Sequence, residues 1–295
     1  MPEIPEVQSL ANWLGERTAG LVIDRADILA ISALKTFDPP LDALKGRAVV
    51  GWSRRGKFLI AETRALGADT SDPIYLCIHL ARAGWLRWSD EVKATSAKLT
   101  KGPQALRITF HDGSGFTATE AGTDKRLAVH VTRDPETVER IRTLGVDALG
   151  SSFTVEAFTE ILKAAGRSQI KGVLTDQGLI AGIGNAYSDE ALHVAKLSPF
   201  KPSNSLTGQE CALLHQAIVG VFREALERSA GKPVAELKDA KRSGMRVHGR
   251  TGQTCPECGD VVREVAFSSK SIQYCATCQT GGKPLADRRM SRLLK

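Results

Sequence analysis

The cysteine pattern near the end of the chain constrains its folding more than any other feature. Cys255 and Cys258 form one CxxC pair, and Cys275 and Cys278 form a second pair after sixteen intervening residues. Each pair supplies two thiolates from one tight turn, and two facing turns can close a tetrahedron around Zn²⁺. Two disulfides or a thioredoxin-like redox pair are the alternatives, but nothing in the chain indicates export, and a redox CxxC needs no second copy. We therefore predict one closed structural zinc site.

The opposite end of the chain, Met1-Pro2-Glu3-Ile4-Pro5-Glu6, is a candidate for covalent chemistry. If Met1 is removed, Pro2 becomes a secondary amine, and an α-amino group titrates close enough to neutral pH to be a nucleophile toward a sugar aldehyde. Glu3 and Glu6 offer carboxyls for proton transfer. The simpler alternative is that the two prolines only start a helix, where proline is favoured.

Composition indicates a water-soluble globular chain that binds a polyanion. The 295 residues are enough for about two domains and a small module, and 42% are hydrophobic and 25% charged. We find no membrane-spanning stretch and no basic-then-apolar signal segment, and we expect a cytoplasmic protein. The formal net charge of +7 is contributed by residues 241–295, which hold eleven Lys or Arg and four Asp or Glu. A basic zinc module on a neutral body favours nucleic acid over a merely solvated tail.

Hydrophobic periodicity changes along the chain. Residues 4–17 read as a helix, and the short runs after it alternate as in a β-sandwich or barrel. These runs lie at 21–29, 48–52, 58–62, 74–80, 86–88, 106–110, 116–120 and 127–131, with a long polar loop at 89–104. Helical patterns follow from Asp134 to about Gly145, at 158–162, at 170–174 and from Thr207, whose capping box with Glu210 opens a helix to about Arg228. A Gly-, Lys- and Ser-rich loop precedes the zinc module.

A glycine-rich turn lies between two of these helical patterns. Gly182-Ile183-Gly184 leads into Asn185, which opens a new helix whose N-terminal amides suit a phosphate. A dinucleotide site needs a preceding strand that is absent here. A helix–turn–helix that binds the DNA backbone fits better than that reading, and an ordinary helix connection is the remaining alternative.

Several motifs occur together in one order: Pro2 to Val7, Arg55-Gly56-Lys57-Phe58-Leu59, the Gly182–Asn185 turn and the four cysteines. In this combination the chain resembles the formamidopyrimidine-DNA glycosylase / endonuclease VIII family over essentially its whole length. The resemblance implies an α+β multidomain fold. Its parts would be an N-terminal β-sandwich domain (1–134), a helical helix–two-turn–helix domain (135–240) and a zinc-finger β-hairpin module (241–295).

The resemblance also implies an activity and roles for particular residues. The family members are base-excision-repair enzymes that excise damaged bases and cleave the abasic site. Pro2 would attack C1′ of a flipped nucleotide to form a Schiff base, and Glu3 would be the general acid. Glu6 resembles an acidic residue of the lesion pocket, and Lys57 and Asn185 match phosphate-binding positions. We expect one structural zinc ion, damaged double-stranded DNA as the partner, and a monomer.

Departures from the family pattern bear on substrate choice. Lys270 lies where the family commonly has an arginine, and lysine cannot form a bidentate phosphate contact. Arg82 replaces a methionine that fills the space of the flipped base, and Lys125-Arg126 precedes Leu127 where other members have Arg-Arg-Phe. The loop from Gly231 to Gly244 also looks shorter than in members that cap 8-oxoguanine. These differences argue against 8-oxoguanine as the main substrate.

Two other functions fit parts of this sequence. The altered residues at positions 82 and 270 are compatible with a non-catalytic, zinc-dependent DNA-damage-binding protein that keeps the same fold. A generic zinc-ribbon nucleic-acid protein with unrelated enzymology would instead show no dependence on a free N-terminal proline.

Overall fold

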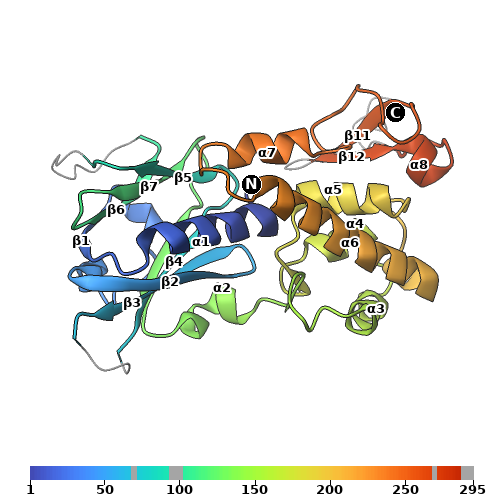
Figure 1. The fold of residues 1–295 in the computed structure, drawn as a ribbon. Helices are drawn as coiled ribbons and strands as arrows, with labels where there is room; N and C mark the ends of the chain where they lie inside the picture. Colours follow the sequence, from blue (N-terminus) through green and yellow to red (C-terminus); the bar gives the residue numbers. More distant parts are fainter. Residues whose placement is uncertain (68–71, 93–101, 268–270, 287–295) are drawn as a thin grey trace. The chain divides into compact units, whose positions relative to one another are not determined.

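The computed structural model describes residues 1–67, 72–92, 102–267 and 271–286. They form two compact units (Figure 1). The first comprises Met1–Thr143 with Ser229–Leu237, and the second comprises Leu144–Arg228 with Lys238–Lys295. None of the helices in these described ranges combines the length and apolarity that crossing a bilayer requires.

The first unit is the predicted β-sandwich. One antiparallel sheet has the strand order β1-β6-β7-β5 and the other has the order β2-β3-β4-β8. The strands are β1 (Ile23–Ile28), β2 (Arg47–Arg55), β3 (Phe58–Ala65), β4 (Ile74–His79), β5 (Gly84–Ser89), β6 (Gln104–Phe110), β7 (Gly115–Glu120) and β8 (Ala128–Thr132). Two short 3₁₀ helices, η1 (Ile31–Ala33) and η2 (Leu41–Leu44), lie between β1 and β2. All eight predicted strands are present.

Helix α1 (Ile4–Thr18) closes one side of this core because its apolar residues repeat at helical spacing. Val7, Leu10 and Leu14 are buried in one cluster with Leu59 of β3 and Phe116 of β7. Two polar contacts fix the helix along β2. The Gln8 side chain accepts a hydrogen bond from Arg54 Nε at 2.9 Å, and the Trp52 indole donates to Thr18 Oγ1 at 2.9 Å.

The predicted single helix from Asp134 to about Gly145 is wrong. The chain instead forms a 3₁₀ turn η3 (Pro135–Thr137), a four-residue helix α2 (Glu139–Arg142) and a short strand β9 (Val146–Asp147). Val138 interrupts the helix because it adopts extended backbone angles and buries its side chain. The Asp134 carboxylate caps the first turn by accepting from the Glu136 amide.

The second unit is helical, as predicted, and ends in a hairpin. Its helices are α3 (Val155–Ala164), α4 (Ile170–Thr175), α5 (Asn185–Val194), α6 (Gly208–Ser229), α7 (Leu237–Ser243) and α8 (Ala276–Thr280). Strand β10 (Ile180–Ala181) pairs with β9, a 3₁₀ turn η4 (Ser203–Ser205) precedes α6, and β11 (Val262–Ala266) pairs with β12 (Ser271–Cys275). The predicted capping box at α6 is formed, because Thr207 and Glu210 exchange side-chain to backbone hydrogen bonds.

The segment after α6 is not only a loop. Val234 and Leu237 are buried in the core of the β-sandwich unit, and the Val234 carbonyl accepts a hydrogen bond from the Trp85 indole at 3.2 Å. Helix α7 follows directly. The Gly, Lys and Ser content of this segment concealed two buried apolar residues, Val234 and Leu237, with only two residues between them.

Candidate nucleic-acid interface and metal centre

Pro2 and Glu3 lie directly before the first turn of α1, and both are buried. Glu3 is the N-cap residue, and its carboxylate accepts from the Glu6 amide while Glu6 Oε2 accepts from the Glu3 amide at 2.9 Å. Pro5 lies within the first helical turn, where its missing N–H costs nothing. Pro5 therefore helps to start the helix, and the capping box holds the carboxyls of Glu3 and Glu6 in fixed positions beside Pro2.

Lys57 lies in the tight turn between β2 and β3. Gly56 takes the left-handed conformation there, with φ of 55°, which glycine adopts without strain. Lys57 is only 6% exposed. Thr18 at the end of α1 contacts Trp52 of β2, and Gln8 near the start of α1 contacts Arg54. Since Arg54 is nearer than Trp52 to the turn after β2, the start of the helix points toward this turn.

His79 lies close enough to Lys57 to feel its charge, and no sequence motif predicted it as a site residue. It pairs with Phe58 across β3 and β4, and the two rings lie 4.8 Å apart. Burial, helped by the charges of Arg140 and Lys57, lowers the pKa of His79 to about 3, so the ring is neutral. Its Nδ1 is buried without a hydrogen-bond partner among the described residues. The only sequence signal was its place three residues before Arg82.

Arg82 is exposed on the tight turn that joins β4 to β5. The turn requires glycine at position 84, because a Cβ there would lie 1.9 Å from the Leu80 carbonyl oxygen. The Ala121 amide donates to the Ala83 carbonyl at 3.3 Å. The structure therefore brings the Arg82 turn beside the start of the loop that contains Lys125 and Arg126.

The loop of Lys125 and Arg126 is shaped by the buried carboxylate of Glu120. This carboxylate accepts from the amides of Arg126 and Leu127 at 2.9 to 3.0 Å. The Lys125 ammonium donates to the Glu120 carbonyl, and Arg126 forms an exposed ion pair with Asp124 at 2.8 Å. Lys125 and Arg126 thus both contact groups of their own loop. An exposed ion pair such as that of Arg126 contributes little free energy, so a phosphate can replace its carboxylate.

Asn185 is positioned by the turn between α4 and α5. The Gln177 side chain accepts from the Gly182 amide at 2.9 Å and donates to the Ile183 carbonyl at 2.7 Å, and Gly182 has a φ of 99°. Asn185 then starts α5 after the N-cap residue Gly184. Asn185 Nδ2 donates to the Ser271 carbonyl of β12 at 2.8 Å. Asn185 is therefore more than a helix cap, because its side chain joins α5 to the C-terminal hairpin.

A buried ion pair between α4 and α5 also contacts the residue that follows this glycine turn, Asn185. Lys171 Nζ donates to Asp189 Oδ1 at 2.5 Å, to Ser188 Oγ at 2.8 Å and to the Asn185 carbonyl at 3.1 Å. The other Asp189 oxygen lies 2.7 Å from His248 Nδ1. The side chains of Lys171 and Asp189 are 6% and 0% exposed. Burial of a charge on this scale is tolerated only when partners compensate it.

Replacing Asp189 with alanine is expected to lower the free energy of unfolding by about 3–5 kcal/mol, because it leaves the Lys171 ammonium buried without its counter-ion. Chemical denaturation followed by circular dichroism measures the change. Glu160→Ala is the matched control, since Glu160 pairs with Lys163 in the same unit but both side chains are largely exposed, and its cost is expected to be within about 0.5 kcal/mol. Equal effects of the two substitutions would contradict this assignment.

The four predicted cysteines come together at one point. All four sulfurs lie within 4.8 Å of one another, with 3.9 Å between Cys255 and Cys278 and 3.4 Å between Cys258 and Cys275. Sulfurs at the corners of a tetrahedral zinc site are about 3.8 Å apart, since each Zn–S bond is about 2.3 Å. The geometry fits a four-thiolate metal centre, and these separations are too long for disulfide bonds.

Backbone amides support two of these sulfurs. A hydrogen bond from the Asp260 amide lowers the pKa of the Cys258 thiol. The Cys278 amide donates to the Cys275 sulfur, although burial raises the pKa of Cys275 to about 11. Such N–H donors stabilise thiolates, which are the form that a metal binds.

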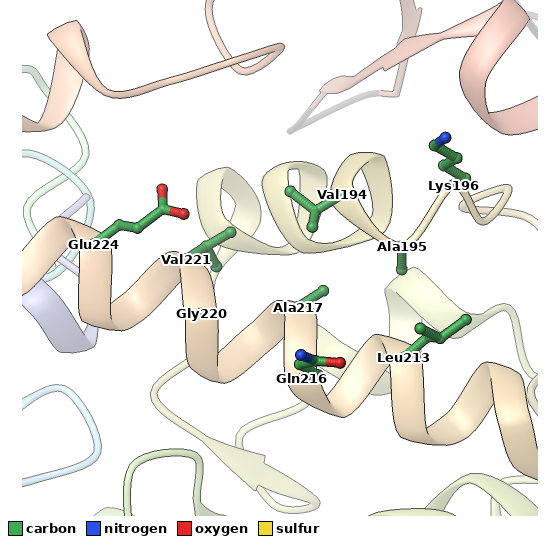
Figure 2. A pocket seen from close by; sticks show the side chains of 9 residues that line it. All are labelled: Val194, Ala195, Lys196, Leu213, Gln216, Ala217, Gly220, Val221 and Glu224. Atoms are coloured by element: carbon green, nitrogen blue, oxygen red, sulfur yellow. The ribbon is translucent and has the colours of Figure 1, made fainter. Parts of the chain in front are cut away.

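Lys270 lies outside the described residues. A hollow of ≈ 490 Å³ lies between α5 and α6 (Figure 2) and contains none of the candidate residues. Its lining is largely apolar, with Lys196 and Glu224 at opposite ends (Figure 2).

Comparison with known proteins defines the family. Residues 1–126 match the model of the formamidopyrimidine-DNA glycosylase N-terminal domain, and residues 144–235 match that of the formamidopyrimidine-DNA glycosylase H2TH domain. The formamidopyrimidine-DNA glycosylase of Desulforamulus reducens is 31% identical over an aligned length of 290 residues, and the match covers 95% of this chain and 99% of the relative. The chain therefore belongs to the formamidopyrimidine-DNA glycosylase family.

Two more relatives add detail. An uncharacterized formamidopyrimidine-DNA glycosylase-like protein of Mycobacterium tuberculosis is 59% identical over 154 residues, which are 52% of this chain and 96% of that protein. The Lactococcus lactis formamidopyrimidine-DNA glycosylase in complex with FAPY-dG-containing DNA has a TM-score of 0.80 and 25% identity, and the match covers 94% of this chain and 100% of that one. The predicted family and fold class are confirmed.

Proposed function

We propose that this protein is a bifunctional DNA glycosylase, which removes damaged bases from duplex DNA and then cleaves the abasic site as a lyase. The observation that supports this most strongly is the buried Pro2–Glu3 pair directly before the first turn of α1, in a chain of this family. Structures of the L. lactis relative with abasic-site DNA and with FAPY-dG-containing DNA support the choice of damaged DNA as partner.

The chemistry begins once Met1 has been removed. The lone pair of the Pro2 nitrogen attacks C1′ of the damaged nucleotide, and the bond between C1′ and the base breaks with its electron pair leaving on the base. The proton of the attacking nitrogen passes to the departing base, so the nitrogen regains the lone pair that it needs to form an iminium. Glu3 protonates the sugar ring oxygen, so that the ring opens and C1′ becomes an iminium carbon bound to Pro2. Loss of a C2′ proton then expels the 3′ phosphate. A second elimination releases the 5′ phosphate, and water hydrolyses the iminium.

Access to C1′ requires that the nucleotide leave the base stack. We assign Lys57 to the phosphate beside the flipped nucleotide, because it is a buried cation toward which the start of α1 points. Glu6 keeps its place at the lesion pocket through the capping box with Glu3. Arg82, Lys125 and Arg126 lie on adjacent loops and would contact the DNA where the base has been removed.

Residues 135–240 and 241–295 would hold the DNA backbone, while residues 1–134 contain the reacting groups. Asn185 at the N-terminus of α5 is assigned to a phosphate, since helix N-termini favour anions, and Lys270 to another. The metal at the four cysteines is assigned as zinc, whose tetrahedral thiolate preference matches the site. It would hold the basic hairpin in shape and take no part in bond breaking, because four cysteines leave no open position. We propose that the protein acts as a monomer.

Glu3→Gln tests the proposed acid. Glutamine keeps the size of the side chain and its ability to accept from the Glu6 amide but has no acidic proton. Removal of a damaged base, measured in single-turnover assays on duplexes with formamidopyrimidine, 8-oxoguanine or an oxidised pyrimidine, is expected to slow by about 10²–10⁴-fold. An unchanged rate on the preferred lesion would remove Glu3 from the mechanism. Inactivity of the unaltered protein on every lesion and on abasic DNA would overturn the proposed function and leave a non-catalytic DNA-binding protein.

A further inference from the structure

Helix α5 has a polar stripe, buried at Asp189 and His193, where a helix that packs against other elements normally has apolar residues. Asn185, Asp189 and His193 are spaced four residues apart and therefore lie on one face. Each contacts the C-terminal module. Asn185 donates to the Ser271 carbonyl, Asp189 pairs with His248, and His193 Nε2 lies 3.3 Å from the Cys255 sulfur.

A fourth contact fixes the same helix to the chain that leads into the metal centre. The buried carboxylate of Glu190 accepts from the three successive amides of Arg246, Val247 and His248 at 2.7 to 2.9 Å. Several independent hydrogen bonds thus fix the position of His193 relative to Cys255. The contact between the imidazole and the sulfur therefore follows from the packing of α5 and does not depend on the rotamer of a single exposed side chain.

His193 is 1% exposed, and its Nδ1 has no hydrogen-bond partner among the described residues. The contact with Cys255 is therefore the one polar contact of the ring within that part of the chain. Burying an imidazole in this way is costly unless the remaining contact is valuable. A leucine or phenylalanine would fill the space without that cost.

A metal-bound cysteine is a thiolate, which has no proton and can only accept a hydrogen bond. The hydrogen between the two groups must then lie on His193 Nε2. The sulfurs of Cys258 and Cys275 already accept backbone amides. His193 provides the corresponding donor for Cys255. Four thiolates on one divalent cation leave a net charge of about −2, and N–H donors disperse that charge.

We infer that His193 is a positioning residue of the metal centre: its Nε2–H donates to the Cys255 thiolate and makes retention of the metal depend on helix α5. The inference rests on the proposed metal site. Partners outside the direct ligands commonly change metal affinity by about 10–100-fold. Asn185 donates to Ser271 of β12, the strand that ends at Cys275, so loss of the metal would also release the contact that holds the Asn185 side chain.

The test compares metal release from the full-length protein and three variants. Each is loaded with zinc and mixed with an excess of chelator, and release is followed with a metal-sensitive dye. His193→Phe is expected to release zinc about 10–100-fold faster than the unaltered protein. His193→Gln, which retains an N–H donor, is expected to recover part of the difference. His215→Phe is the matched control, because His215 lies in the same unit and contacts the Phe153 carbonyl instead of a cysteine.

Equal release from the His193→Phe variant and the unaltered protein would overturn the inference. If that variant fails to fold, ¹¹³Cd-substituted unaltered protein decides. A scalar correlation between ¹¹³Cd and the His193 Hε2 proton is expected through the hydrogen bond, and its absence would contradict the assignment. Metal content of the unaltered protein is measured first. A protein that binds no metal at its four cysteines would refute the metal site itself. This outcome is distinguishable from a bound metal whose release rate does not depend on His193.

Discussion

Blocking the Pro2 nitrogen is expected to abolish covalent trapping on abasic DNA. An uncleavable extension before Pro2 converts its nitrogen into an amide, which has no lone pair available to attack C1′. Pro2→Ala, after removal of Met1, leaves a primary amine with altered placement, and trapping by borohydride is expected to fall at least about 10²-fold. The measurement is the yield of the borohydride-stabilised protein–DNA complex on denaturing gels.

Two controls separate chemistry from binding in this experiment. Pro5→Ala changes a second buried proline in the same turn whose nitrogen takes no part in the reaction, and its trapping yield is expected to match that of the unaltered protein. Affinity for abasic duplex, measured by fluorescence anisotropy, is expected to be nearly the same for the Pro2→Ala protein. Normal trapping by the blocked protein would show that another amine is the nucleophile.

Removing one metal ligand is expected to have the second-largest effect. Cys275→Ser should release the metal, because Cys275 is a buried member of the cluster and the sulfurs lie at tetrahedral spacing. Apparent zinc-binding energies of about 10–16 kcal/mol in isolated fingers show how much folding energy such a site can supply. We expect the hairpin of β11 and β12 to lose its order and its ability to present basic residues.

The consequence for DNA binding follows from the charge of residues 241–295. Each charged hydrogen bond to a phosphate contributes about 1.5–3 kcal/mol, so losing even one weakens binding at least about tenfold. Anisotropy with a lesion-containing duplex, together with metal analysis, measures both effects. Cys211→Ala is the control, since Cys211 is buried in α6 outside the cluster. A Cys275→Ser protein that keeps its metal and its DNA affinity would contradict the structural role of the site.

Local patterns in the sequence predicted most of the fold. Strand-length apolar runs between turn residues identified all eight sandwich strands, and the capping box at Thr207 identified the start of α6. The failures occurred where a tertiary contact overrides the local pattern. Val138 is drawn into a buried extended conformation, and Leu237 starts α7 from within a stretch that resembles a loop.

The part of the candidate site that local sequence patterns encode was also predictable. The cysteine spacing and the order of motifs depend on residues that are close in sequence. His79 and His193 depend on contacts between distant elements. His193 lies sixty-two residues from the cysteine that it contacts, and the only local signal for His79 was its place three residues before Arg82. Only the fold identifies such residues, because their environment is made by several elements at once.

The identity of the trapped amine tests the central claim most directly. The untagged protein is incubated with an abasic duplex and borohydride, the complex is digested, and the cross-linked peptide is sequenced by mass spectrometry. The account predicts a peptide that begins at Pro2, lacks Met1 and has the sugar remnant on the proline nitrogen. A remnant on a lysine such as Lys57, or an intact Met1 in the cross-linked peptide, would contradict it.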